Sequence, residues 1–285
     1  MHIAVTGASG FIGRALVERL RQRGDRVRAV SRGPDLASYA DITALARALG
    51  EAEAIIHLAA RAHRQGDDAA FSCNVEATRA LVQVAQGRRV VLVSSIGVNG
   101  NRTTSRPFSE VDRPQPIEAY ARSKLRCEEI VRDAANSVIV RPPLVYGPRA
   151  PGNFARLVTA VSSGWPLPLG AIRNKRSLVG LDNLCELLMC CASHPAAAGE
   201  LFLASDGEDL STPQIVEAVA EGLGVRPRLW PCPPSILRLG GERFATSLCA
   251  SLQVDSSKAR RVLGWTPKRP AREGIAAAAA AWRTP

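Results

Sequence analysis

Lysine and aromatic residues are scarce in this chain of 285 residues. Lysine and arginine together number 37, yet only four are lysines, and tyrosine occurs three times. Long apolar runs are also missing: the alanine run at 276–281 is too short to span a membrane and predicts a terminal helix. The first residues are typical of a strand and carry no charged leader with an apolar segment. We therefore expect a cytoplasmic protein without membrane insertion.

Paired metal-ligand spacings are missing as well. The seven cysteines form no CxxC motif and no cysteine–histidine pairing, so we expect no metal site. Scattered thiols of this kind are typical of small, buried apolar residues in a reducing compartment. His57 lies inside an apolar stretch, which predicts a core histidine and not a ligand.

Acidic residues are fewer than basic ones, and the formal net charge is +11. The excess is spread along the chain, without a basic block or interleaved aromatic residues, so we expect no nucleic-acid binding. Arginine also suits small ligands that carry phosphate groups, because its planar fork binds phosphate oxygens bidentately.

What the first half does contain is a regular alternation of apolar strands and helices. Strands are expected at 2–7, 26–32, 54–60, 89–95 and 137–143, and helices at 10–23, 41–50, 67–86 and 117–135. This alternation predicts an α/β fold, a Rossmann-type doubly wound parallel sheet with helices on both faces. We expect residues 1–145 to form mainly the dinucleotide-binding domain. Residues 146–285 would form mainly a smaller α/β substrate-binding lobe, with about 176–205 returning to the core.

The segment TGASGFIG joins the first strand to the first helix. Its glycines permit a tight turn, a close approach of the backbone to a pyrophosphate, and packing of helix against strand. The N-terminus of the helix then offers free N–H groups to the phosphates. The predicted phosphate-binding residues are Gly7, Ser9, Gly10, Phe11, Ile12 and Gly13.

The end of the second strand lacks an acidic residue. A fold of this kind that selects NAD usually places a carboxylate there for the ribose 2′-hydroxyl, whereas this chain has Ser31 and Arg32. Arg32 can pair with a 2′-phosphate, so NADP(H) is favoured, and NAD(H) remains an alternative. A solvated surface arginine is the competing interpretation. Asp41 and Ile42 are candidates for contact with the adenine.

One of the four lysines follows a tyrosine by four residues. Tyr120 and Lys124 lie one turn apart on the same face of a predicted helix, and an ammonium group beside a phenol stabilises the phenolate. The pair therefore suits proton transfer on a hydroxyl or carbonyl oxygen. Ser95 ends a predicted strand, at the edge where α/β sheets bind ligands, and its hydroxyl can hydrogen-bond the same oxygen. No histidine or carboxylate is evidently tied to Ser95, which disfavours a hydrolase.

Taken together, these motifs resemble the extended short-chain dehydrogenase/reductase family of sugar-nucleotide epimerases, dehydratases and reductases. The resemblance rests on TGASGFIG, HLAA, SS before VNG, YARSK and RPPLVYGP, and it runs to DSSKARRVLGWTP near the C-terminus. It implies that the C-terminal lobe holds a nucleoside diphosphate sugar, with a UDP-sugar as the expected substrate. It implies a catalytic set of Ser95, Tyr120 and Lys124, and cofactor contacts at Leu58, Ala59, Ala60 and Pro143.

The resemblance also indicates substrate contacts. Asn153 matches an asparagine that meets the diphosphate, and Arg176 an arginine that clamps it. Arg243 is a second phosphate candidate, and Asn99 lies in a loop that shapes the sugar pocket. The pair Asp182–Asn183 matches an acidic turn that starts a helix, which we interpret as an N-cap.

Two reactions at C4 of the sugar compete. A 4-ketoreductase receives hydride from exchanging NAD(P)H, whereas a 4-epimerase keeps one NAD bound. Arg32 and the VNG segment favour reduction, and several segments resemble a subgroup that reduces UDP-4-keto-6-deoxy-N-acetylhexosamines for bacterial surface polysaccharides. A dehydratase usually has an acid pair after the serine, where this chain has Ile96 and Gly97. A third alternative is a non-catalytic NADP-binding regulator, although such proteins typically lose the tyrosine or lysine. The family also implies a homodimer through the helix of Tyr120.

Overall fold

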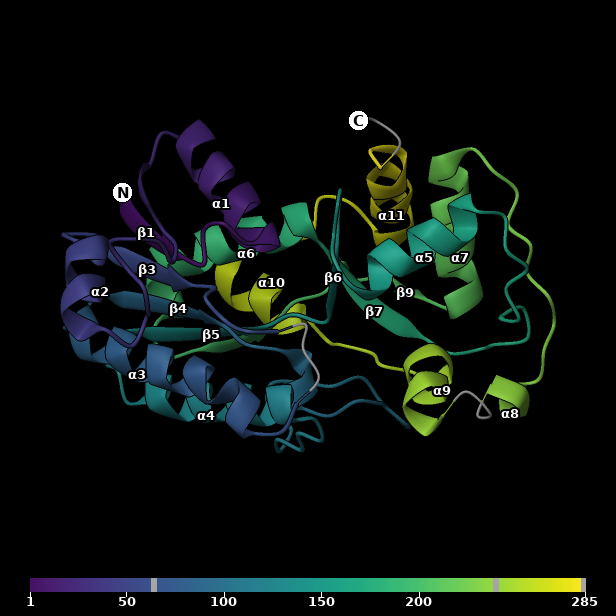
Figure 1. The fold of residues 1–285 in the computed structure, drawn as a ribbon, viewed down its shortest axis with the longest axis horizontal. Helices are drawn as coiled ribbons and strands as arrows, with labels where there is room; N and C mark the ends of the chain where they lie inside the picture. The colour runs from purple at the N-terminus through teal and green to yellow at the C-terminus, as the bar shows by residue number, and fades with distance from the viewer. Residues whose placement is uncertain (63–65, 238–240, 283–285) are drawn as a thin grey trace.

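The computed structural model describes residues 1–62, 66–237 and 241–282, which form a larger and a smaller lobe (Figure 1). The main sheet of the larger lobe has six parallel strands in the order β2-β1-β3-β4-β5-β8. These strands are β1 (His2–Thr6), β2 (Arg26–Val30), β3 (Ala54–His57), β4 (Arg89–Val93), β5 (Ser137–Arg141) and β8 (Leu201–Leu203). The predicted doubly wound α/β fold is therefore confirmed.

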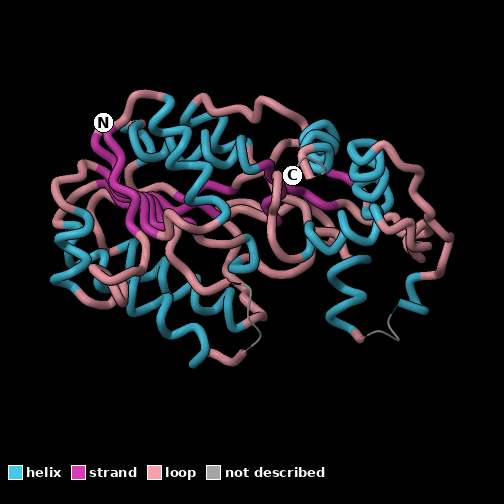
Figure 2. The backbone as a smooth tube through the Cα atoms, turned by 45° about the horizontal axis from the view of Figure 1, so that its top comes forward, coloured by secondary structure: helices cyan, strands magenta, loops and turns pink. Residues whose placement is uncertain are grey.

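Helices cover both faces of the main sheet, as the edge-on layers in Figure 2 show. One face carries α2 (Ile42–Leu49), α3 (Ser72–Ala85) and α4 (Ala119–Arg132). The other face carries α1 (Phe11–Gln22), α6 (Leu181–Ser193) and α10 (Ser257–Leu263). Because both faces are covered, the inner strands are continuous apolar runs and not alternating ones.

The smaller lobe is built on a second sheet of three strands in the order β6-β7-β9. Its strands are β6 (Leu144–Tyr146), β7 (Arg176–Gly180) and β9 (Asp209–Leu210). Its helices are α5 (Asn153–Ser162), α7 (Thr212–Leu223), α8 (Pro234–Leu237), α9 (Glu242–Cys249) and α11 (Ala271–Ala280). A capping box begins α7, with the Ser211 hydroxyl and the Gln214 side chain each accepting from the other's backbone N–H.

The chain crosses between the lobes several times. Helix α6 and strand β8 lie within the segment expected to return to the core, and both belong to the larger lobe. Helix α10 also packs on the main sheet, through Ala259 and Leu263, although it lies outside that segment. These two apolar side chains complete the cover over β8, which explains the additional crossing.

Strand β2 is one edge of the main sheet. No further strand forms in residues 31–53, all of which the structure describes, so the chain passes from β2 through α2 directly to β3. Arg28 on this edge donates from Nε to the carbonyl oxygen of Ala48, at 3.0 Å, near the end of α2. A cation at the C-terminal end of a helix is favourable, so Arg28 holds α2 against the edge.

Candidate functional site

The glycine turn lies at the carboxyl ends of the central strands. Gly7 has φ +69°, and a Cβ atom there would lie 2.8 Å from the backbone nitrogen of Ala59. A Cβ atom on Gly13 would lie 2.2 Å from the carbonyl oxygen of Gly7. Helix α1 has no side-chain cap and no acidic residue in its first turn. The turn therefore needs glycine at both positions, and it leaves the first N–H groups of α1 available to a phosphate.

A serine–tyrosine pair connects this turn to β2. The Ser31 hydroxyl accepts from the backbone N–H of Ser9 at 2.9 Å. The Tyr39 hydroxyl accepts from the N–H of Gly7 and donates to the carbonyl oxygen of Val30, both at 2.9 Å. Burial raises the pKa of Tyr39, and the nearby charge of Arg32 acts against this rise. Arg32 is exposed and lies close to the glycine turn, where a 2′-phosphate would be placed.

Of the two candidate adenine contacts, one has another role. Asp41 is the N-cap of α2 and accepts from the N–H of Ala44 at 2.9 Å. Ile42 is exposed beside it, at 41%. The segment at 58–60 continues β3 directly beneath the turn, because the N–H of Leu58 donates to the carbonyl oxygen of Thr6.

Helix α4 brings the predicted catalytic residues to the carboxyl end of β4. Lys124 is 3% exposed, and its ammonium group donates to the carbonyl oxygen of Val93 at 2.8 Å and lies 5.9 Å from the centre of the Tyr120 ring. Ser95 follows two residues after Val93 and accepts from the N–H of Gly97 at 3.1 Å. The carbonyl oxygen of Pro142 accepts from the N–H of Ile96, which places the adjoining Pro143 near the serine.

Sequence reasoning missed the residue that continues the polar face of α4. Glu128 lies four residues after Lys124, is fully buried, and accepts from the Ser94 hydroxyl at 2.5 Å. Both of its oxygens also accept from Arg141 on β5, at 2.8 and 2.6 Å. Lys124 and Glu128 therefore hold consecutive residues at the end of β4, immediately before Ser95. The same helical spacing that identified Tyr120 and Lys124 would have found Glu128.

Asn99 belongs to this buried network. Its side chain is 2% exposed, accepts from Arg141 Nη1 at 2.8 Å, and donates to the carbonyl oxygen of Ser109 at 3.2 Å. The amide has internal partners at both ends, so it anchors the loop at 99–109. A contact between Asn99 and the substrate remains a prediction.

His57 is a core histidine, as expected, and its tautomer follows from its neighbours. The Thr78 hydroxyl donates its one proton to the carbonyl oxygen of Asn74 at 2.8 Å, so it can only accept from His57 Nε2, at 3.3 Å. His57 Nδ1 is left as the acceptor for the Thr6 hydroxyl at 2.7 Å. Burial, with the charge of Lys124, lowers the pKa of His57 to about 3. The neutral hydrogen-bonded chain of Thr6, His57 and Thr78 thus supports the glycine turn, which begins at the residue after Thr6.

Asn74 is another residue that sequence reasoning missed. Its amide group accepts from the backbone N–H of Arg61 at 2.7 Å and donates to the Ser123 hydroxyl at 3.2 Å. Ser123 in turn donates to the carbonyl oxygen of Tyr120 at 2.7 Å. Asn74 therefore fixes the segment after β3 against the first turn of α4.

The predicted diphosphate contacts lie in the smaller lobe. Asn153 is the first residue of α5 and is exposed. Arg176 begins β7 and donates from Nη1 to the carbonyl oxygens of Ser247 and Ala250, at 3.1 and 3.2 Å, and burial lowers its pKa. Arg243 belongs to α9, but its side chain lies outside the described part of the structure. The structure thus brings Arg176 to the C-terminal end of the helix that carries Arg243.

A match to a known family is consistent with this geometry. A model of the NAD dependent epimerase/dehydratase family matches residues 3–203. The chain belongs to this family. The resemblance inferred from the motifs is therefore confirmed, and the chain is an enzyme of a family that uses a nicotinamide cofactor.

Individual proteins that are similar to this epimerase/dehydratase family member support the family assignment. A UDP-glucose 4-epimerase of Vibrio cholerae is 36% identical over 304 residues, covering 96% of this chain and 93% of that protein. The UDP-N-acetylglucosamine 4-epimerase of Bacillus cereus has a TM-score of 0.81 at 22% identity, over 99% of both chains. The RMD protein of Pseudomonas aeruginosa, complexed with NADPH, has a TM-score of 0.80 at 19% identity, over 100% of both chains. The two solved structures share the fold.

The residues present fit the family's cofactor. A nicotinamide dinucleotide needs a backbone free of Cβ atoms at the pyrophosphate, which Gly7 and Gly13 provide. It also needs uncapped N–H groups at the start of α1, which the structure has. Among the described residues, no group of three or more histidine, cysteine, aspartate or glutamate side chains is arranged to hold a metal ion. None of the helices within the described ranges is long and apolar enough to cross a bilayer.

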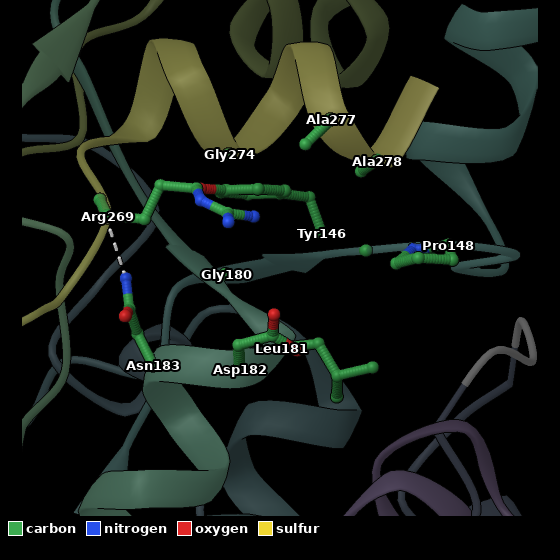
Figure 3. A pocket seen from close by; sticks show the side chains of 11 residues that line it. Tyr146, Pro148, Gly180, Leu181, Asp182, Asn183, Arg269, Gly274, Ala277 and Ala278 are labelled. Atoms are coloured by element: carbon green, nitrogen blue, oxygen red, sulfur yellow. Dashed lines mark hydrogen bonds between the residues drawn. The ribbon is translucent and has the colours of Figure 1, made fainter. Parts of the chain in front are cut away.

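The junction between the lobes of this epimerase/dehydratase family member contains a small cavity of about 130 Å³ (Figure 3). On its wall, the Tyr146 hydroxyl donates to Asp206 at 2.6 Å, and Asn183 donates to Asp206 at 2.7 Å and to the carbonyl oxygen of Arg269 at 2.9 Å. Burial raises the pKa of both Tyr146 and Asp206. The cluster ties β6, α6 and the approach to α11 together, and none of the predicted catalytic residues lines the cavity.

The N-cap interpretation of Asp182–Asn183 is wrong. The N-cap of α6 is Gly180, which supplies no side-chain cap. The backbone N–H of Gly180 donates to the buried carboxylate of Asp206. Asp182 forms an ion pair with Arg19 on α1 at 2.6 Å. A carboxylate from a distant segment thus replaces the local cap, which sequence spacing alone does not show.

Proposed function

We propose that this enzyme reduces the C4 ketone of a UDP-4-keto-6-deoxy-N-acetylhexosamine with NADPH. The observation that supports this proposal is the absence of a carboxylate directly after β2, where the chain has Ser31 and Arg32. The exposed guanidinium group of Arg32 beside the glycine turn suits a 2′-phosphate. The nearest acidic residue along the chain, Asp35, lines a hollow at the end of β2 that Ser31, Arg28 and Arg47 also line, so two basic side chains accompany it there. A cofactor with a 2′-phosphate fits an enzyme that exchanges its nicotinamide at each turnover.

The catalytic residues supply the proton and hold the substrate oxygen. The cofactor supplies the hydride when bound. Tyr120 donates its hydroxyl proton to O4 of the substrate, and the Ser95 hydroxyl holds that oxygen by a hydrogen bond. Lys124 is fixed on the carbonyl oxygen of Val93 and presents its positive charge near the Tyr120 ring, which favours the phenolate left after proton transfer. In the smaller lobe, Arg176, Asn153 and Arg243 are the candidates for the diphosphate.

A 4-epimerase is the second candidate. It is favoured by the UDP-glucose 4-epimerase of Vibrio cholerae, which is 36% identical over nearly the whole chain. Such an enzyme would use the same Ser95, Tyr120 and Lys124 to move the proton in both directions. It would keep its NAD bound throughout and show no net consumption of cofactor.

Cofactor analysis separates the two reactions. The purified protein is denatured, and NAD(H) and NADP(H) are measured in the supernatant. Absorbance at 340 nm is then followed with NADPH and a UDP-4-keto-6-deoxy-sugar. We expect little retained cofactor and substrate-dependent loss of NADPH. Stoichiometric resident NAD without net consumption would instead establish the epimerase.

A Tyr120→Phe variant tests the proposed role of Tyr120 as the general acid. We expect turnover to fall by a factor of roughly 10² to 10⁴, because the general acid is lost. NADPH binding, measured by fluorescence titration, should be retained. Unchanged turnover in the variant would contradict this role of Tyr120.

A further inference from the structure

Two loops lie side by side at the outer end of the smaller lobe, where the chain leaves α5 and α7 (Figure 1). The N–H of Leu167 donates to the carbonyl oxygen of Arg228 at 2.7 Å, and the N–H of Trp230 donates to that of Leu167 at 2.9 Å. The N–H of Gly170 donates to the carbonyl oxygen of Trp230 at 2.8 Å, where a Cβ atom on Gly170 would lie 3.0 Å from the same oxygen. Backbone pairing therefore holds the two loops close together.

These loops expose large apolar side chains. Trp165 is 68% exposed and Trp230 is 64% exposed, and Val225 nearby in the chain is 36% exposed. Prolines flank both tryptophans, at 166, 168, 231 and 233, which limits the freedom of the backbone to withdraw the rings. We call Trp165, Trp230, Val225 and the basic residues described next the tryptophan patch.

The same loops carry charge of one sign only. Arg173, Lys175, Arg226 and Arg228 are all exposed. Segments 163–175 and 222–235 contain no aspartate or glutamate. Among the described residues, neither Arg226 nor Arg228 has an ion-pair partner. Exposed tryptophan among unpaired arginines is the composition that binds the interface of a bilayer with anionic headgroups.

We propose that the tryptophan patch docks this enzyme on the surface of a membrane that contains anionic phospholipid. The indole rings would enter the interfacial layer, and the four basic side chains would contact the phosphate groups. A second copy of the chain is a poorer occupant, because two patches of the same positive charge would face each other across the contact. The proposal concerns location and does not depend on which sugar reaction the enzyme performs.

Vesicle sedimentation of the full chain tests the proposal. The probes are vesicles of equal parts phosphatidylcholine and phosphatidylglycerol, and vesicles of phosphatidylcholine alone. We expect binding only to the former, weakened by salt, together with a blue shift of tryptophan fluorescence. Trp265 is 6% exposed, so it contributes little to such a shift.

Two pairs of variants make the test specific. Trp165→Ser with Trp230→Ser should remove the fluorescence shift and weaken sedimentation. Arg226→Ser with Arg228→Ser should weaken sedimentation by roughly tenfold or more. The matched controls are Arg260→Ser with Arg261→Ser, which removes the same charge from α10, and Val111→Ser with Ile117→Ser, which removes apolar side chains exposed elsewhere. Both controls should bind as the wild type does.

Three results would overturn the proposal. These are a failure to bind the anionic vesicles at low salt, equal weakening by the control variants, and self-association. Self-association would appear as a rise in mass with concentration in light scattering, abolished by the tryptophan variants. None of these readouts uses turnover, so failure of the proposed reaction and failure of membrane docking can be told apart.

Discussion

At the scale of single residues, His57 gives this protein a defined response to acid. Its pKa falls from 6.5 to about 3 on folding, because burial and the charge of Lys124 disfavour the imidazolium. Between these two pH values the unfolded chain binds a proton that the folded chain does not. The free energy of unfolding therefore falls as the pH is lowered through this window, by up to about 1.4 kcal/mol per pH unit from this residue.

A His57→Gln variant should lose this contribution. Its free energy of unfolding at neutral pH should be lower, because the hydroxyls of Thr6 and Thr78 lose the imidazole as their hydrogen-bond partner. Its decline between pH 6.5 and 3 should be shallower than in the wild type. Urea unfolding at a series of pH values measures both effects. An identical decline in the two proteins would contradict the role assigned to His57.

At the same scale, Arg32 is the residue that we propose selects the cofactor. An Arg32→Ser variant should raise KM for NADPH by about tenfold or more, because a charge-assisted contact to the 2′-phosphate is lost. KM for NADH should change little, since that cofactor has only a hydroxyl there. Arg261→Ser, on the exposed face of α10, is the control for loss of one positive charge. An equal rise in KM for both cofactors would show that Arg32 does not bind the 2′-phosphate of NADPH.

At the scale of elements, a buried ion pair fixes α4 against β4 and β5. Glu128 and Arg141 are both almost fully buried and share two hydrogen bonds. Glu128→Leu alone should lower the free energy of unfolding by about 3–5 kcal/mol, because it leaves the buried charge of Arg141 unpaired. Arg141→Leu should cost less, because Arg132 still pairs with Glu128 at 3.1 Å. The double variant should lose much less than the sum. Urea unfolding of all four proteins measures the coupling, and additive losses would contradict it.

Elements of the larger lobe could be predicted from the sequence, and those of the second sheet could not. Strands such as β4 are apolar runs separated by helices, so local patterns identify them. Strands β6 and β9 have only three and two residues. Their pairing joins Tyr146 to Gly180 and Leu210 to Arg176, across 30 or more positions in the chain. So short a strand has no period of its own, and its formation depends on distant partners.

The same distinction explains the site. The glycine turn and the Tyr120–Lys124 pair are local patterns, and their residues could be named in advance. Asp206 caps α6 from a segment 26 residues away from Gly180, and Asn183 binds the chain again at Lys268 and Arg269. Such contacts arise only when the lobes come together, so spacing alone led to the wrong cap.

At the scale of the whole molecule, the larger lobe is not a contiguous piece of the chain. Its core includes Leu184, Leu187 and Leu188 from α6, and Phe202 from β8, and all four are fully buried. Trp265 completes the same core from beyond α10. The segment before residue 146 therefore lacks one edge strand and two of the helices on one face of its sheet.

A fragment of residues 1–145 should consequently fail to fold, although the glycine turn and the catalytic residues all lie within it. The fragment would expose the face of β3 and β4 that α6 covers, with a loss of apolar burial far larger than the stability of a typical domain. Circular dichroism during thermal unfolding should show no cooperative transition, and NADPH should not bind. The full chain should unfold in one transition, since α6 of the larger lobe also contacts β6 and β7, and the Asp206 cluster ties β6 to α6. A fragment that melted cooperatively and bound NADPH would show that the first 145 residues form an independent domain, and that the crossings position the smaller lobe without stabilising the larger one.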